Sequence, residues 1–118
     1  MSNEEIAIYK KIELMQEYIN AECEGYIYSP TDKDYQIFLR IKHIVDSLCK
    51  NALVLLKQHK TLFKGNAQNL SLQQTEQLLR QIYLCCALPN TPGEKNNAIT
   101  EILRKFNLHD DLFFIQYR

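Results

Sequence analysis

Apolar residues recur every three or four positions along most of the chain, the spacing that places them on one face of an α-helix. The first such segment predicts a helix from about residue 3 to residue 23. Ser2 and Glu5 form an S-x-x-E capping box at its start, and we expect Gly25 to end it in the left-handed conformation. Its predicted core face consists of Ile8, Tyr9, Ile12, Met15 and Ile19.

The second segment predicts one long helix. Thr31 as its N-cap and Asp34 in its first turn mark the start, and residues 63–66 mark the end. Between them an apolar seam steps alternately by three and four residues, with a single polar member, His59. The seam consists of Phe38, Ile41, Val45, Leu48, Ala52, Leu55, His59 and Leu62.

The length of this helix conflicts with the size of the chain. Unbroken, a helix of about 32 residues would be about 48 Å long, whereas a compact chain of 118 residues is only about 35 Å across. Three arrangements resolve the conflict: the helix breaks near Lys50 and Asn51, the bundle is elongated, or the seam extends into a partner or a second copy.

Two shorter helices follow. The third begins after the capping box of Ser71 and Gln74, and Pro89 stops it. Its predicted core face consists of Leu72, Leu78, Leu79, Ile82, Tyr83 and Cys86. The fourth begins at Thr91, with Pro92 as its first residue. Its predicted core face consists of Ala98, Ile99, Ile102, Leu103 and Phe106.

The ends of the fourth helix are also marked. Glu94 completes a capping box at its start, and Asn107 is expected to cap its end.

Residues 110–118 are apolar enough to dock, as a helical turn across the bundle or as an extended strand. The sequence therefore predicts a single all-α domain over residues 1–118, an elongated four-helix bundle with one long central helix and a docked C-terminal tail. Only three glycines and three prolines argue against a turn-rich β-fold.

Charge is balanced overall but separated along the chain. Acidic and basic residues number 14 each, so the chain lacks the basic excess that drives non-specific nucleic-acid binding. Residues 1–34 nevertheless hold eight acidic and three basic residues, a net charge of −5. Residues 35–64 hold six basic residues and one acidic residue, a net charge of +5. The sequence thus predicts an acidic segment beside a basic helix.

Two surfaces are candidates for binding. The basic ridge comprises the side chains at the outermost heptad position of the long helix: His43, Lys50, Lys57 and Lys64. It either contacts phosphates or an acidic protein, or only solubilises the helix; the absence of interleaved aromatic residues favours the second interpretation. The acidic junction between the first two helices comprises Tyr26, Tyr28, Asp32, Asp34 and Tyr35. Its tyrosines either bind a basic partner or merely pack over one end of the bundle.

Part of the acidic junction resembles a known family. Residues 27–32, Ile-Tyr-Ser-Pro-Thr-Asp, are similar to the Tyr-Tyr-Pro-Ser-Asp stretch of the small helical immunity proteins that neutralise DNase colicins. In that family the tyrosines and nearby acids bind the basic toxin, so the resemblance implies binding roles for Tyr28 and Asp32. It covers six of 118 residues, and Ser29 stands where the family has its second tyrosine.

Motifs for catalysis, metal binding and targeting are absent from the sequence. There is no glycine-rich phosphate loop, nucleophile elbow or metal-ligand spacing, so we expect no enzyme activity, cofactor or metal site. The four cysteines, Cys23, Cys49, Cys85 and Cys86, are expected to be buried free thiols. The start of the chain is acidic and its longest apolar run spans five residues, 52–56, which favours a cytoplasmic location.

These patterns favour a non-catalytic inhibitor that binds a basic protein and occludes it, as a toxin-immunity or anti-defence protein does. The first alternative is a homodimeric, nucleic-acid-associated regulator that uses the basic ridge. The second is a secretion or assembly adaptor with an apolar groove. A homodimer through the long helix is possible in any of these classes.

Overall fold

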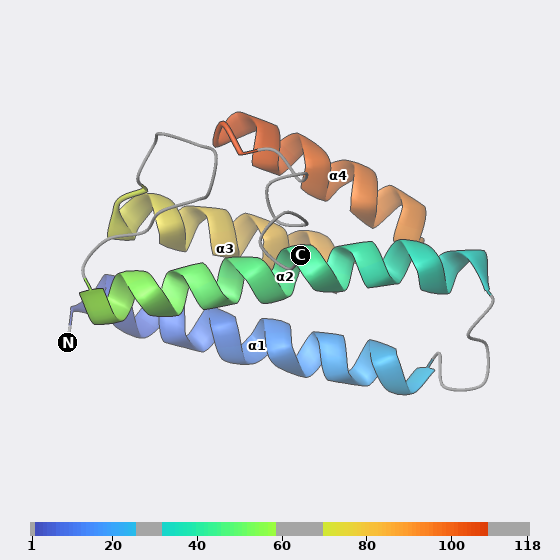
Figure 1. Ribbon diagram of the computed structural model, residues 1–118, viewed down its shortest axis with the longest axis horizontal. Coiled ribbons are helices and arrows are strands. Elements are labelled where there is room, and N and C mark those ends of the chain that lie inside the picture. Colours follow the sequence, from blue (N-terminus) through green and yellow to red (C-terminus); the bar gives the residue numbers. More distant parts are fainter. Residues whose placement is uncertain (1, 26–31, 59–69, 109–118) are drawn as a thin grey trace.

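The protein is an all-α four-helix bundle, as the sequence predicts (Figure 1). The computed structural model describes residues 2–25, 32–58 and 70–108. Its helices are α1 (Asn3–Gly25), α2 (Lys33–Gln58), α3 (Leu72–Ala87) and α4 (Pro92–Lys105). Consecutive helices run in opposite directions, so α1 and α3 point one way and α2 and α4 the other.

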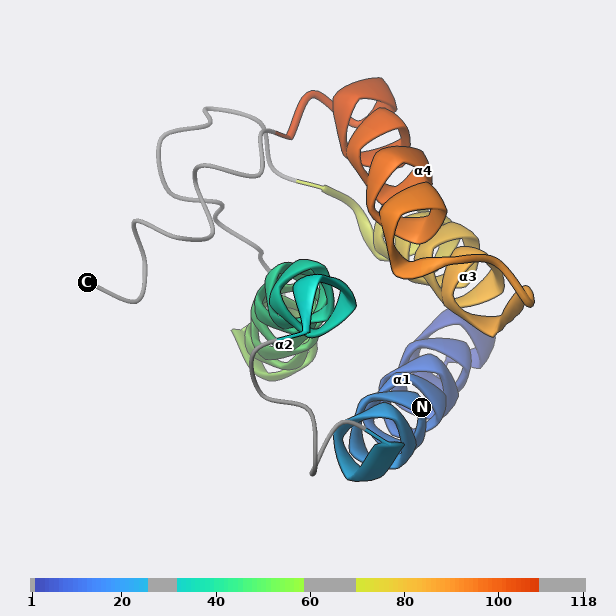
Figure 2. The same cartoon turned by 90° about the vertical axis from the view of Figure 1, so that its right-hand side faces the viewer.

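The bundle has two layers of unequal size. Viewed from its end, α1, α3 and α4 form a curved layer with α3 in the middle, and α2 lies against the concave side of that layer (Figure 2). The most extensive helix pairing joins α1 to α3, although these helices are not consecutive in the chain. The helix α2 contacts all three others, so it closes the core.

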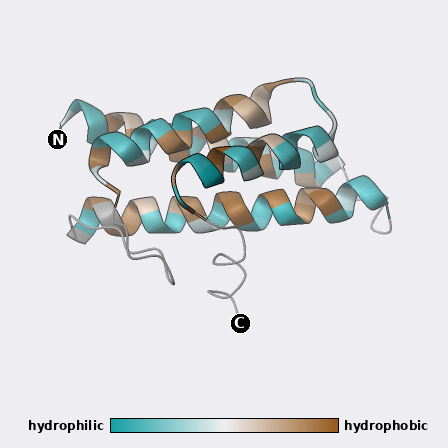
Figure 3. Cartoon of the chain, turned by 90° about the horizontal axis from the view of Figure 1, so that it is seen from above, coloured by the Kyte–Doolittle hydropathy of each residue, from teal (hydrophilic) through white to brown (hydrophobic). Residues whose placement is uncertain are grey.

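The core is built from one apolar stripe on each helix. Along every helix brown and teal residues alternate, which is the mark of an amphipathic helix (Figure 3). The most deeply buried large side chains come from all four helices: Phe38, Ile8, Met15, Ile41, Ile44, Leu48, Leu78, Leu79, Ile82, Ile99 and Leu103. The predicted core faces of α2, α3 and α4 are therefore largely confirmed.

The helix α2 is continuous, and the predicted alternative of a break near Lys50 and Asn51 is wrong. Its 26 residues correspond to about 39 Å of helix, which matches the longest dimension of a molecule measuring 41 × 28 × 23 Å. The amide of Asn51 donates to the Ser47 carbonyl at 2.8 Å, so this polar residue is held within the helix. The bundle is therefore elongated along α2.

The seam of α2 is used inside the monomer. Its members from Phe38 to Ala52 are each at most 2% exposed. The side chain of the predicted member Leu55 is not described. Three further predictions lie outside the described residues: the seam members His59 and Leu62, the helix end at residues 63–66 and the tail at residues 110–118. Over its described length, the seam is not a free surface for a second copy.

The predicted capping boxes form in full at α1 and α3, whereas at α4 only the Thr91 side chain bonds the helix backbone. At α1 the Glu5 N–H donates to Ser2 Oγ at 3.2 Å, and the Ser2 N–H donates to the Glu5 carboxylate at 3.4 Å. The box of Ser71 at α3 is likewise reciprocal. At α4 the Glu94 N–H donates to Thr91 Oγ1, and the carboxylate accepts from the Thr91 hydroxyl. These bonds satisfy N–H groups that a first helical turn leaves without partners.

The predicted cap at Asn107 is also confirmed. Its φ of 58° is left-handed, a conformation that asparagine tolerates better than most residues. The Leu108 N–H donates to the Leu103 carbonyl at 2.8 Å, and the Asn107 N–H donates to the Arg104 carbonyl at 3.0 Å. This is the Schellman pattern, and the buried Leu108 completes its apolar contact.

Two local predictions are corrected. Gly25 is the last residue of α1 and does not adopt the left-handed conformation. Tyr9 is 38% exposed and does not belong to the core, because it is rotated 100° around the helix from the buried Ile8. The predicted N-cap of α2, Thr31, lies outside the described residues. Within them, the carboxylate of Asp32 caps this helix by accepting from the Asp34 N–H at 2.8 Å.

The burial pattern of α3 can be tested with two identical substitutions on one helix. Leu79 is 1% exposed and Leu84 is 55% exposed. Leu79→Ala should lower the free energy of unfolding by about 2–5 kcal/mol, and Leu84→Ala should change it by less than about 0.5 kcal/mol. Urea denaturation measures both, and equal effects would contradict the packing of α3.

Candidate partner-binding surfaces

Acidic side chains from two helices gather at one end of the bundle. The end of α1 and the start of α2 lie together there in both views (Figures 1 and 2). Glu24, Asp32 and Asp34 are all exposed at this end. Because α1 and α2 are antiparallel, the last residues of α1 and the first residues of α2 lie at the same end of the bundle.

The residues of the acidic junction do not share one environment. Tyr26 and Tyr28 lie outside the described residues. Tyr35 is half-buried and packs against the core, which matches the packing interpretation of its role. Asp32 caps α2 as described above, and Asp34 lies in its positive first turn, so both carboxylates also stabilise the helix start. Glu24 at the end of α1 is exposed as well.

The basic ridge is exposed where it is described. His43, Lys50 and Lys57 all lie on the solvent side of α2, as the heptad pattern predicts, and Lys64 lies outside the described residues. The ammonium of the neighbouring Lys42 pairs with the carboxylate of Asp46, one turn further along α2, at 2.8 Å. The ridge therefore faces away from the three-helix layer.

A buried lysine links two helices that sequence reasoning did not connect. Lys95 on α4 is only 9% exposed, and its ammonium donates to the Tyr18 hydroxyl on α1 at 3.3 Å. The same ammonium lies 5.0 Å from the centre of the Tyr18 ring. The helices α1 and α4 form opposite edges of the curved layer, so this contact spans α3 (Figure 2). The burial of Lys95 could have been predicted from the sequence, because Lys95 precedes the buried Ile99 by four residues and so lies on the same face of the helix.

The thiols nearest to this lysine are held in the neutral form. Burial raises the pKa of Cys86 to about 12, and it also raises the pKa of the half-buried Cys85, while the Lys95 ammonium opposes both shifts. On α2, burial and the Asp46 carboxylate raise the pKa of Cys49 to about 12. All four cysteines are free, as predicted, but only Cys49 and Cys86 are fully buried. These thiols pack as apolar groups and are poor nucleophiles.

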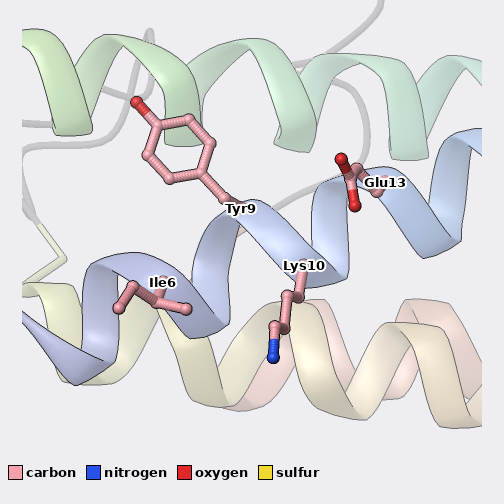
Figure 4. Close-up of a pocket in the computed structure, with 4 residues that line it drawn as sticks. All are labelled: Ile6, Tyr9, Lys10 and Glu13. Atoms are coloured by element: carbon pink, nitrogen blue, oxygen red, sulfur yellow. The ribbon is translucent and has the colours of Figure 1, made fainter. Parts of the chain in front are cut away.

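A shallow hollow lies on the outer side of α1. It has a volume of about 360 Å³, and the described residues that line it are Ile6, Tyr9, Lys10 and Glu13 of α1 (Figure 4). Tyr9 and Glu13 extend toward the α2 side, and Lys10 extends toward the α3 side.

Within the described residues, no three His, Cys, Asp or Glu side chains converge in the manner of metal ligands. No described helix has the length and apolar character needed to cross a bilayer. The chain matches no protein-family model, and no curated protein or solved structure matches it.

Removing the Tyr18 hydroxyl, which accepts a hydrogen bond from Lys95, should destabilise the fold. Tyr18→Phe should lower the free energy of unfolding by about 1.5–3 kcal/mol, because the buried ammonium loses a hydrogen-bond acceptor while the ring remains. Tyr9→Phe, the same change at an exposed site of α1, should have an effect of less than about 0.5 kcal/mol. Chemical denaturation of both variants provides the measurement, and a neutral Tyr18→Phe would show that the contact adds no stability.

Stability should also fall at alkaline pH because of the buried thiols. Below pH 9 Cys49 is protonated in both the folded and the unfolded chain, whereas above pH 9 only the unfolded chain ionises, since burial raises the folded pKa to about 12. Between pH 8 and pH 10 the stability advantage of the wild type over Cys49→Ala should therefore shrink by about 1 kcal/mol. Urea denaturation at the two pH values tests this, and a constant difference would refute the shifted pKa.

Proposed function

We propose that the protein is a non-catalytic binding protein that occludes a basic protein partner, of the toxin-immunity or anti-defence type. The observation that carries this proposal is the exposed acidic end of the bundle, where the exposed residues Glu24, Asp32 and Asp34 lie at the end of α1 and the start of α2. A partner with a basic surface would be steered to this end and held by charge complementarity. Residues 1–34 carry a net charge of −5, so the attraction is reinforced along α1.

The inhibition would be steric. A rigid helical end that covers the functional surface of its partner needs no turnover and no cofactor. Tyr26 and Tyr28 are the aromatic members of this proposed surface, whereas Tyr35 packs against the core. The resemblance of residues 27–32 to colicin immunity proteins implies a binding role for Tyr28 and Asp32. We place the protein in the cytoplasm on this proposal, because such an inhibitor acts where its partner is made.

The proposal is tested by reversing charge at the acidic end. Glu24→Lys with Asp34→Lys should weaken binding of a stoichiometric basic protein, co-purified from native lysate, by at least about tenfold. The matched control is Glu4→Lys with Glu101→Lys, which makes the same change in net charge at exposed positions elsewhere. Equal binding by both double variants and the wild type would discard this surface.

A second candidate function is supported by the exposure of His43, Lys50 and Lys57 in one row on α2. On this hypothesis the protein associates with nucleic acid as a regulator, and the ridge contacts phosphates. Lys50→Glu with Lys57→Glu distinguishes the candidates: it should release the chain from a DNA column if the ridge binds phosphates, and it should leave the basic protein bound if the acidic end does so.

A further inference from the structure

We draw no further inference here: the strongest candidate, the shallow hollow on the outer side of α1 beside Ile6, Tyr9, Lys10 and Glu13, is an apolar surface bordered by one basic and one acidic side chain, and nothing in the structure shows what covers it.

Discussion

The structure depends on the burial of one apolar seam, that of α2, in the concave side of the layer formed by α1, α3 and α4. Phe38, Ile41 and Leu48 are almost fully buried there. At about 25 cal/mol per Å² of apolar surface, such burial is the main favourable contribution to folding. Because α2 contacts every other helix, the burial of its seam determines which sides of the four helices face solvent.

Much of this architecture was predictable from local sequence signals. The capping boxes at Ser2 and Ser71 and the left-handed Asn107 depend on side chains only a few residues apart, so the sequence contains the whole interaction. The sequence predicted one long central helix in an elongated bundle, and this is confirmed, but the sequence alone did not exclude a break in that helix, because a compact sphere of this size is shorter than the helix. The bundle resolves that conflict by extending along α2 to 41 Å.

The features that sequence reasoning missed depend on contacts between distant segments. The pairing of Lys95 with Tyr18 joins residues 77 positions apart, and an isolated lysine in an apolar stripe gives no indication of its partner. Tyr9 was assigned to the core because it fits a loose helical pattern, but 100° of rotation separates it from Ile8. The acidic junction was predicted as one surface, yet Asp32 is engaged in capping and Tyr35 in packing, since a helix start imposes its own requirements.

The pairing of α1 with α3, rather than with its chain neighbour α2, is the central feature of the fold. This pairing places the acidic residues of α1 and the basic residues of α2 on different sides of the bundle. Methyl–methyl nuclear Overhauser effects measure it directly. Most of the interhelical nuclear Overhauser effects of Ile8, Ile12 and Met15 should connect α1 to α3. We expect their partners to be Leu78, Leu79 and Ile82. Effects directed mainly to the side chains of α2, with few to α3, would contradict the three-helix layer and the separation of surfaces that follows from it.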